Sequence, residues 1–99
     1  MTYIYIVTPN GDEFPCKVGI SDNPEKRLAS LQCGASSKLA LREVYWLDTR
    51  AKALAMEREF HESYVEWRMN SEWFGINFED ANYWLFENLV APMIREGRQ

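Results

Sequence analysis

Two apolar segments joined by a turn constrain the fold of this 99-residue chain more than any other feature. Residues 2–7 alternate aromatic and β-branched side chains, a pattern typical of a β-strand. The turn sequence Pro9-Asn10-Gly11-Asp12 follows, and a second strand is expected at about residues 14–21. The first part of the chain is therefore predicted to form an antiparallel hairpin.

The remainder of the chain predicts helices packed on this sheet. Asn23 is a suitable N-cap for a helix that begins at Pro24, and Gly34 is a suitable end for it. The later elements are expected at 39–47 (strand), 50–67 (helix), 69–71 (loop), 73–74 (short apolar run) and between Asn77 and Pro92 (helix). The prediction is an α+β fold of order ββαβαα, in which a small three-stranded antiparallel sheet is flanked by helices. It forms one domain over residues 1–99, because a chain of this length closes a single core.

Composition narrows the function classes. A net charge of −4 argues against a non-specific nucleic-acid binder, yet it is compatible with an enzyme that contacts one or two phosphates in a local pocket. The apolar runs are too short for a membrane span or a signal sequence. Cys16 and Cys33 lack a metal-ligand spacing, so free thiols and a cytoplasmic location are expected.

An acidic residue lies in the apolar sector of the long predicted helix. At helical spacing Glu57 falls near the middle of that sector and His61 follows one turn later, whereas Glu59 points to the opposite side. A carboxylate directed at a core must be paired, protonated or bound to a cation, because burying it alone is costly. An ion pair of Glu57 with Arg27 or Arg58, a hydrogen bond with His61 and a metal site all satisfy this requirement.

Five short motifs follow one another along the chain. They are Tyr3-Ile4-Tyr5, Lys17-Val18-Gly19, the run from Asp22 to Leu28, Glu57 with His61 in the segment MEREFH, and Glu72-Trp73-Phe74. In this order and spacing they resemble the GIY-YIG nuclease superfamily, in particular the phage-associated branch whose second signature is Lys-Ile/Val-Gly. The resemblance implies the three-stranded antiparallel sheet described above and metal-dependent hydrolysis of DNA in the cytoplasm of a bacterial or phage-infected cell.

The resemblance also implies roles for single residues. Tyr5 matches the tyrosine that helps to activate the attacking water, and Arg27 matches the arginine that contacts the scissile phosphate. Glu57 matches the glutamate that holds one Mg²⁺ or Mn²⁺, with Glu59 as a competing alignment. Gly19 is expected to leave room for the substrate backbone beside the second strand.

Lys17 replaces the second tyrosine of the superfamily's usual signature. It is interpreted as a general base, as a phosphate-binding cation or as a solvated strand lysine; in the second case the base is Tyr5 or His61. Tyr3 lies on the strand face of Tyr5 and shares its role, unless both are ordinary sheet aromatics. Glu72 is expected to help order the site, next to two aromatic residues that pack.

Two functions follow from these features. The first is a metal-dependent DNA endonuclease, favoured by the joint presence of Glu57, Arg27 and His61. The alternative is a catalytically weak or inactive nuclease-like protein with a binding or regulatory role; one version of this hypothesis is a phage-encoded protein. The net charge and the missing tyrosine favour this alternative. DNA is the expected partner, no membrane is expected, and a homodimer through the aromatic last helix is a further hypothesis.

Overall fold

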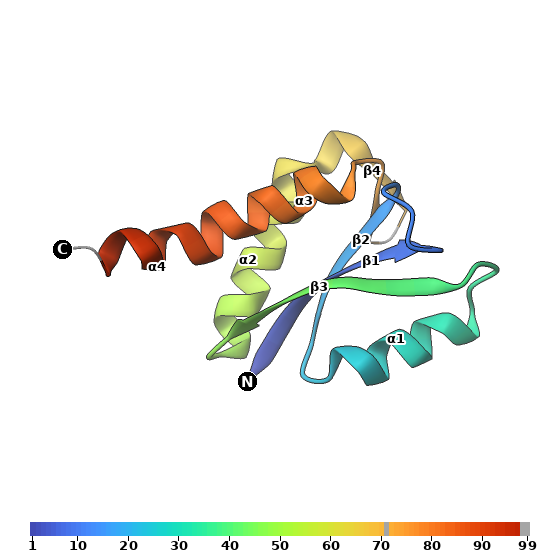
Figure 1. Ribbon diagram of the computed structural model, residues 1–99, viewed down its shortest axis with the longest axis horizontal. Coiled ribbons are helices and arrows are strands. Elements are labelled where there is room, and N and C mark those ends of the chain that lie inside the picture. Colours follow the sequence, from blue (N-terminus) through green and yellow to red (C-terminus); the bar gives the residue numbers. More distant parts are fainter. Residues whose placement is uncertain (71, 98–99) are drawn as a thin grey trace.

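The computed structural model describes residues 1–70 and 72–97; Ser71 of the expected loop and the last two residues lie outside the described residues. The expected hairpin is present: β1 (Thr2–Pro9) pairs antiparallel with β2 (Cys16–Ser21), and Tyr5 lies opposite Gly19. Asn10 and Gly11 adopt positive φ angles of 55° and 73° at the turn. On its other side β1 pairs with β3 (Leu39–Leu47), so β1 lies inside the sheet (Figure 1).

The predicted three-stranded sheet and the order ββαβαα are wrong. The sheet has five antiparallel strands in the order β3-β1-β2-β5-β4, because β4 (Arg68–Asn70) and β5 (Trp73–Phe74) extend it beyond β2. β5 pairs through Phe74 with Cys16 and through Trp73 with Lys17. Strands of three and two residues are too short to show the alternation from which a strand is predicted. They form because the outer edge of β2 offers backbone partners to β5, and β5 in turn offers them to β4.

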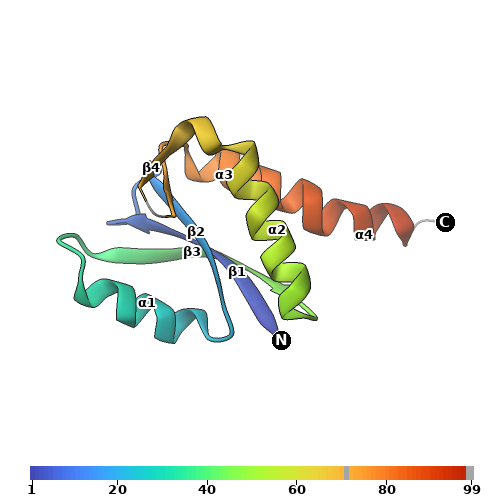
Figure 2. The same cartoon turned by 180° about the vertical axis from the view of Figure 1, so that it is seen from behind.

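The helices begin where the sequence provides caps. The Asn23 side chain accepts a hydrogen bond at the start of α1 (Pro24–Cys33), and Thr49 does so for α2 (Arg50–Ser63), which a 3₁₀ turn, η1 (Val65–Trp67), follows. The last helix is a continuous rod of α3 (Phe78–Leu85), a π-helical turn η2 (Phe86–Val90) and α4 (Ala91–Glu96). The rod extends away from the sheet in both Figure 1 and Figure 2. Its predicted end before Pro92 is wrong, because this proline occupies the first turn of α4, where its missing N–H is tolerated.

Opposite faces of the sheet carry different helices. Ile4 and Ile6 belong to the core cluster formed with α2 and α3, whereas Tyr5 and Val7 belong to a cluster with residues of α1. Side chains alternate along a strand, and residues opposite each other on β1 and β2 share a face. The residues on β2 that lie opposite Val7 and Tyr5, which are Lys17 and Gly19, therefore face α1.

The helices and the cysteines differ in how much of their surface is apolar or exposed. None of the helices within residues 1–70 and 72–97 is long and apolar enough to span a lipid bilayer. On the C-terminal rod Tyr83 and Phe86 are exposed, whereas Trp84 packs against the core. A homodimer through this rod stays a prediction. Cys16 is buried, Cys33 is exposed, and both are free thiols.

Candidate functional site

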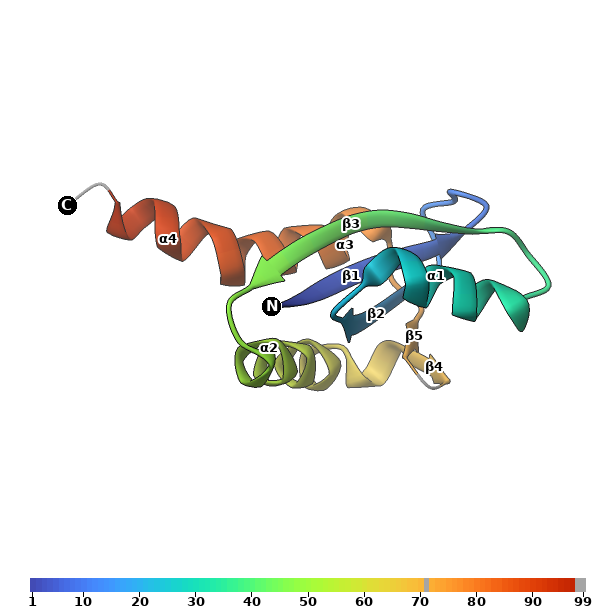
Figure 3. The same ribbon diagram turned by 90° about the horizontal axis from the view of Figure 1, so that it is seen from below.

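Most of the predicted site residues gather at the outer edge of β2, next to the point where β5 begins. Val18 uses both of its backbone polar groups there: its N–H donates to the carbonyl of Glu72 at 3.3 Å, and its carbonyl accepts from Nε2 of His61 at 3.1 Å. Glu72 immediately precedes β5, and His61 belongs to α2. Figure 3 shows that α1 and α2 both approach this part of β2. Residues that are far apart in the sequence therefore contact one another at this edge.

Gly19 lies at the centre of this edge, beneath two polar side chains. A Cβ atom added at Gly19 would lie 2.6 Å from Oη of Tyr5 and 2.7 Å from Oε2 of Glu72. The expected room beside Gly19 is therefore filled by the protein's own hydroxyl and carboxylate groups. The glycine is needed because only its missing side chain lets these two groups come together over the strand.

Lys17 is buried and paired. Its side chain is only 7% exposed, its Nζ lies 3.6 Å from Oε2 of Glu72, and it lies 5.6 Å from the ring centroid of Trp73. The interpretation of Lys17 as a solvated strand lysine is therefore wrong. The same Glu72 oxygen is buried without a hydrogen-bond partner among the described residues, so the ammonium group is the neighbour that balances its charge.

Arg27 and Tyr5 form a second pair. The guanidinium group of Arg27 lies near the hydroxyl of Tyr5, although Arg27 is exposed on α1 and Tyr5 is 1% exposed. Burial raises the pKa of Tyr5, and the polar interaction with the Arg27 guanidinium opposes that rise. The interaction with Tyr5 in turn raises the pKa of Arg27. At neutral pH the site therefore holds a protonated phenol oriented by a permanent cation.

Glu57 and His61 line a neighbouring hollow of about 380 Å³ on α2. Burial raises the pKa of Glu57, and the negative charge of Glu72 raises it further, whereas His61 lowers it. No ion pair joins Glu57 to Arg27 or Arg58 in the described part of the chain, so the two ion pairs considered from the sequence are absent. Because Nε2 of His61 donates its proton to Val18, a neutral ring carries its lone pair on Nδ1.

The remaining predicted residues lie farther from this group. Glu59 is exposed and lines a hollow with Trp84, so the two competing glutamates face different surroundings. Tyr3 donates to Sδ of Met1 at 3.5 Å and lines a hollow beside the start of α1.

Arg27 and Glu57 are linked only indirectly. Arg27 lines a groove with Lys17 and Trp73, and Glu57 lines the hollow on α2. The charges of Arg27, Glu72 and Glu57 all act on the hydroxyl of Tyr5. The guanidinium and the carboxylate therefore line different hollows but influence the same tyrosine.

Glu72 has a larger place in this cluster than the sequence indicated. It touches the space above Gly19, pairs with Lys17 and influences the titration of both Tyr5 and Glu57. Its only sequence signal is its position immediately before two aromatic residues that pack against the sheet. That position turns its side chain toward β2 only because Trp73 and Phe74 form a strand.

The donor groups fit a hard divalent cation. The negative charge of Glu72 adds to the effect of burial in raising the pKa of Glu57, and a cation beside Glu57 would offset this rise. Within residues 1–70 and 72–97 no group of three or more acidic, histidine or cysteine residues is gathered for a metal. A cation that keeps most of its water and takes one carboxylate, as Mg²⁺ does, suits this set.

Comparison with known proteins identifies a domain family over most of the chain. Residues 2–88 match the T5orf172 domain, which is most of the chain. No curated protein and no solved structure matches the chain. The chain therefore belongs to the T5orf172 domain family, a phage-associated nuclease-like domain.

Proposed function

We propose that this protein is a GIY-YIG-type endonuclease that hydrolyses DNA phosphodiester bonds with one divalent cation, Mg²⁺ or Mn²⁺. The observation that carries the proposal is the cluster around Gly19, where a hydroxyl, an ammonium, a guanidinium and a carboxylate group meet beside Glu57. Membership in a nuclease-like family supports it. The chemistry requires charge stabilisation on the phosphate, an oriented water and a proton acceptor.

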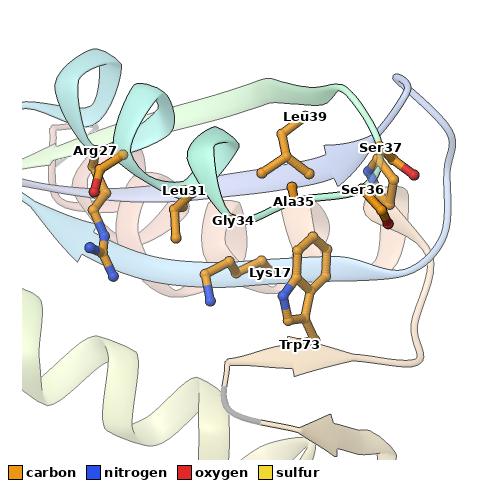
Figure 4. A pocket seen from close by; sticks show the side chains of 11 residues that line it. Lys17, Arg27, Leu31, Gly34, Ala35, Ser36, Ser37, Leu39 and Trp73 are labelled. Carbon is orange, nitrogen blue, oxygen red and sulfur yellow. The ribbon is translucent and has the colours of Figure 1, made fainter.

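Arg27 and Lys17 are assigned to the phosphate. Both line one groove, and Figure 4 shows their side chains extending in the same direction from α1 and β2. The planar guanidinium group matches two phosphate oxygens, and the ammonium group acts as a second, compact charge. A lysine ion-paired with Glu72 is an ammonium without a lone pair, so we assign Lys17 to binding and not to proton removal.

Tyr5 is assigned to orienting the attacking water. Burial raises its pKa, so its hydroxyl keeps the proton at neutral pH and acts as a hydrogen-bonding group. Gly19 lets that hydroxyl reach the edge of the strand. His61 is assigned to accepting the proton of the water, because the lone pair on Nδ1 of its neutral ring is a much stronger base than the protonated phenol of Tyr5.

Glu57 is the residue assigned to hold the cation. When bound, a divalent ion would stabilise negative charge on the phosphate and the leaving oxygen. The pKa of Glu57 is raised in the folded protein, so the carboxylate must lose its proton before it can bind such an ion. Metal affinity is therefore expected to rise with pH above the usual range of a glutamate.

A plasmid nicking assay tests the proposal. Wild-type protein with Mg²⁺ or Mn²⁺ is expected to convert supercoiled DNA to the nicked form, and Glu57→Gln is expected to lower the rate by at least roughly 100-fold, the usual scale for losing a charge-stabilising group. Glu59→Gln is the matched control, because it makes the same change two residues away on an exposed face of α2. Its rate should equal that of the wild type.

Binding without cleavage is the second candidate function. It is favoured by the Lys17–Glu72 ion pair, which neutralises one of the two cations of the groove in a protein of net charge −4. Fluorescence anisotropy with a labelled oligonucleotide in EDTA separates the two candidates. Absence of nicking with either metal, together with measurable binding that Arg27→Leu abolishes, would replace the endonuclease by the binding protein.

A further inference from the structure

A groove of about 520 Å³ runs from the phosphate-binding residues along α1 toward β5. Arg27 and Lys17 line one part of it, and the ring of Trp73 lies beyond Lys17, near Leu39 (Figure 4). Of the described residues that line the groove, two are cationic and none is acidic. Its volume falls within the range of about 300–1,000 Å³ that is usual for small-molecule sites.

The wall formed by the loop after α1 is held in place by hydrogen bonds. The side chain of Gln32 donates to the carbonyl of Ser37 at 2.9 Å and accepts from the N–H of Leu39 at 2.7 Å. The N–H of Ala35 also donates to the carbonyl of Gln32. The loop between α1 and β3 is therefore tied at both of its ends, so the groove is preformed and binding has little ordering cost.

The lining of the groove has a cationic part and an apolar, aromatic part. The part next to the cations suits an anion, whereas the Trp73 ring, with Leu31 and Leu39, offers an apolar and aromatic surface. Ser36 and Ser37 add hydroxyl or backbone groups at the rim. A nucleotide has the same division, with a charged phosphate at one end and a flat base carrying polar edges at the other. Stacking on an aromatic side chain is a common way to hold such a base.

The net charge of the protein favours a base contact over phosphate contacts alone. A chain of net charge −4 has few cations with which to follow a nucleic-acid backbone, so phosphate contacts supply little of its affinity. Another source of binding free energy is required next to the few phosphates that are held. The groove provides it, because its apolar part adjoins Lys17 directly through the contact with Trp73.

We propose that this groove binds an unpaired nucleobase adjoining the phosphate held by Arg27 and Lys17, an inference that rests on the phosphate site of the proposed function. A base inside a duplex is stacked and paired, so it enters such a groove only from a single strand, a gap or a flipped position. The substrate class is therefore nucleic acid with at least one unpaired nucleotide. A fully paired duplex is the poor substrate.

The first test needs no protein variant. A labelled oligonucleotide with a one-nucleotide gap opposite a single unpaired base is compared by anisotropy, in EDTA, with the same molecule carrying an abasic site at that position. Loss of a stacked base is expected to weaken binding by roughly 5- to 150-fold. Equal affinity for the two molecules overturns the inference, whether or not the protein cleaves DNA.

The second test fills the groove. Gly34 lines it, has a φ angle of −102° that any residue adopts, and has nothing within 4 Å of an added Cβ atom, so Gly34→Leu adds bulk without strain. Ala29→Leu adds three carbon atoms, one fewer than Gly34→Leu, at an exposed position of α1 that does not line the groove. Gly34→Leu is expected to lose the preference for the base over the abasic site, and Ala29→Leu to keep it. Circular dichroism melting checks that both variants fold.

The outcomes separate this inference from the proposed function. Base-dependent binding without cleavage leaves the groove as a nucleotide site and removes the endonuclease. Cleavage that is equally fast on gapped, abasic and fully paired DNA keeps the endonuclease and overturns the groove. If the protein binds none of these three molecules, both the inference about the groove and the proposed function are overturned.

Discussion

Replacing Gly19 with alanine is the most direct test of the cluster at the edge of β2. The added Cβ atom would meet Oη of Tyr5, Oε2 of Glu72 and Cζ of Tyr5 at 2.6, 2.7 and 2.8 Å. Ordinary contact begins at 3.4 Å, so these neighbours must retreat by about 0.6–0.8 Å. The ring of Tyr5 is 1% exposed and packed against α1, so it has little space in which to move.

Two opposing effects decide the magnitude of this change. Overpacking a well-filled site costs about 1–3 kcal/mol. Alanine recovers about 0.5–1 kcal/mol over glycine within a strand, because the unfolded chain becomes less flexible. The steric cost is the larger effect, and Gly19→Ala is expected to lower the free energy of unfolding by about 1–2 kcal/mol. The corresponding fall in Tm is roughly 4–16 °C for a domain of this size.

Urea unfolding followed by circular dichroism measures this cost, and a double-mutant cycle locates its source. In a Tyr5→Phe background the closest clash is removed, so Gly19→Ala should cost at least about 0.5 kcal/mol less than in the wild type. Gly34→Ala is the control, since a Cβ atom there meets nothing within 4 Å. A Gly19→Ala variant as stable as the wild type would refute the crowded arrangement of Tyr5 and Glu72.

Three further predictions concern charged and thiol groups. Burial raises the pKa of Glu57, so the folded state binds its proton more tightly than the unfolded state does, and this residue lowers stability as pH rises above the usual range of a glutamate. Glu57→Gln should therefore be more stable than the wild type in urea at pH 7 and equally stable at pH 3; a less stable variant at pH 7 contradicts the shift. Burial raises the pKa of Cys16 to about 12, so a thiol-disulfide reagent should label Cys33 quickly in the native protein and Cys16 only after unfolding; fast native labelling of both speaks against a buried Cys16. Lys17→Met leaves the Glu72 carboxylate beside apolar groups and should cost roughly 2 kcal/mol, less than a fully buried pair because Glu72 is 32% exposed in its side chain. Adding Glu72→Gln should restore part of that loss in urea unfolding, and strictly additive losses would show that the pair does not interact.

Local sequence signals were sufficient for several elements. The alternating residues of β1 and the Asn-Gly turn specify the hairpin, because backbone preferences and side-chain direction are properties of neighbouring residues. The N-caps Asn23 and Thr49 likewise start their helices through contacts three residues away. The helical spacing that placed Glu57 among apolar residues also agrees with its half-buried position on α2.

The additional strands could not be predicted from the same signals. β4 and β5 hold three and two residues; β5 pairs with the outer edge of β2, and β4 pairs with β5. Whether a partner strand reaches that edge depends on the path of the chain after α2. A sequence window of two or three residues contains no information about that path.

What the sequence by itself determined is the set of chemical groups and their local elements: a tyrosine on β1, a lysine and a glycine on β2, an arginine on α1 and a glutamate on α2. Only the tertiary structure decided which of these groups meet. The pairing of β5 with β2 brings Glu72 to Lys17 and over Gly19, and the packing of α1 brings Arg27 to Tyr5. The physical reason is that capping, turns and periodicity act over a few neighbouring residues, whereas the charges of the site come together through strand pairing and helix packing between distant parts of the chain.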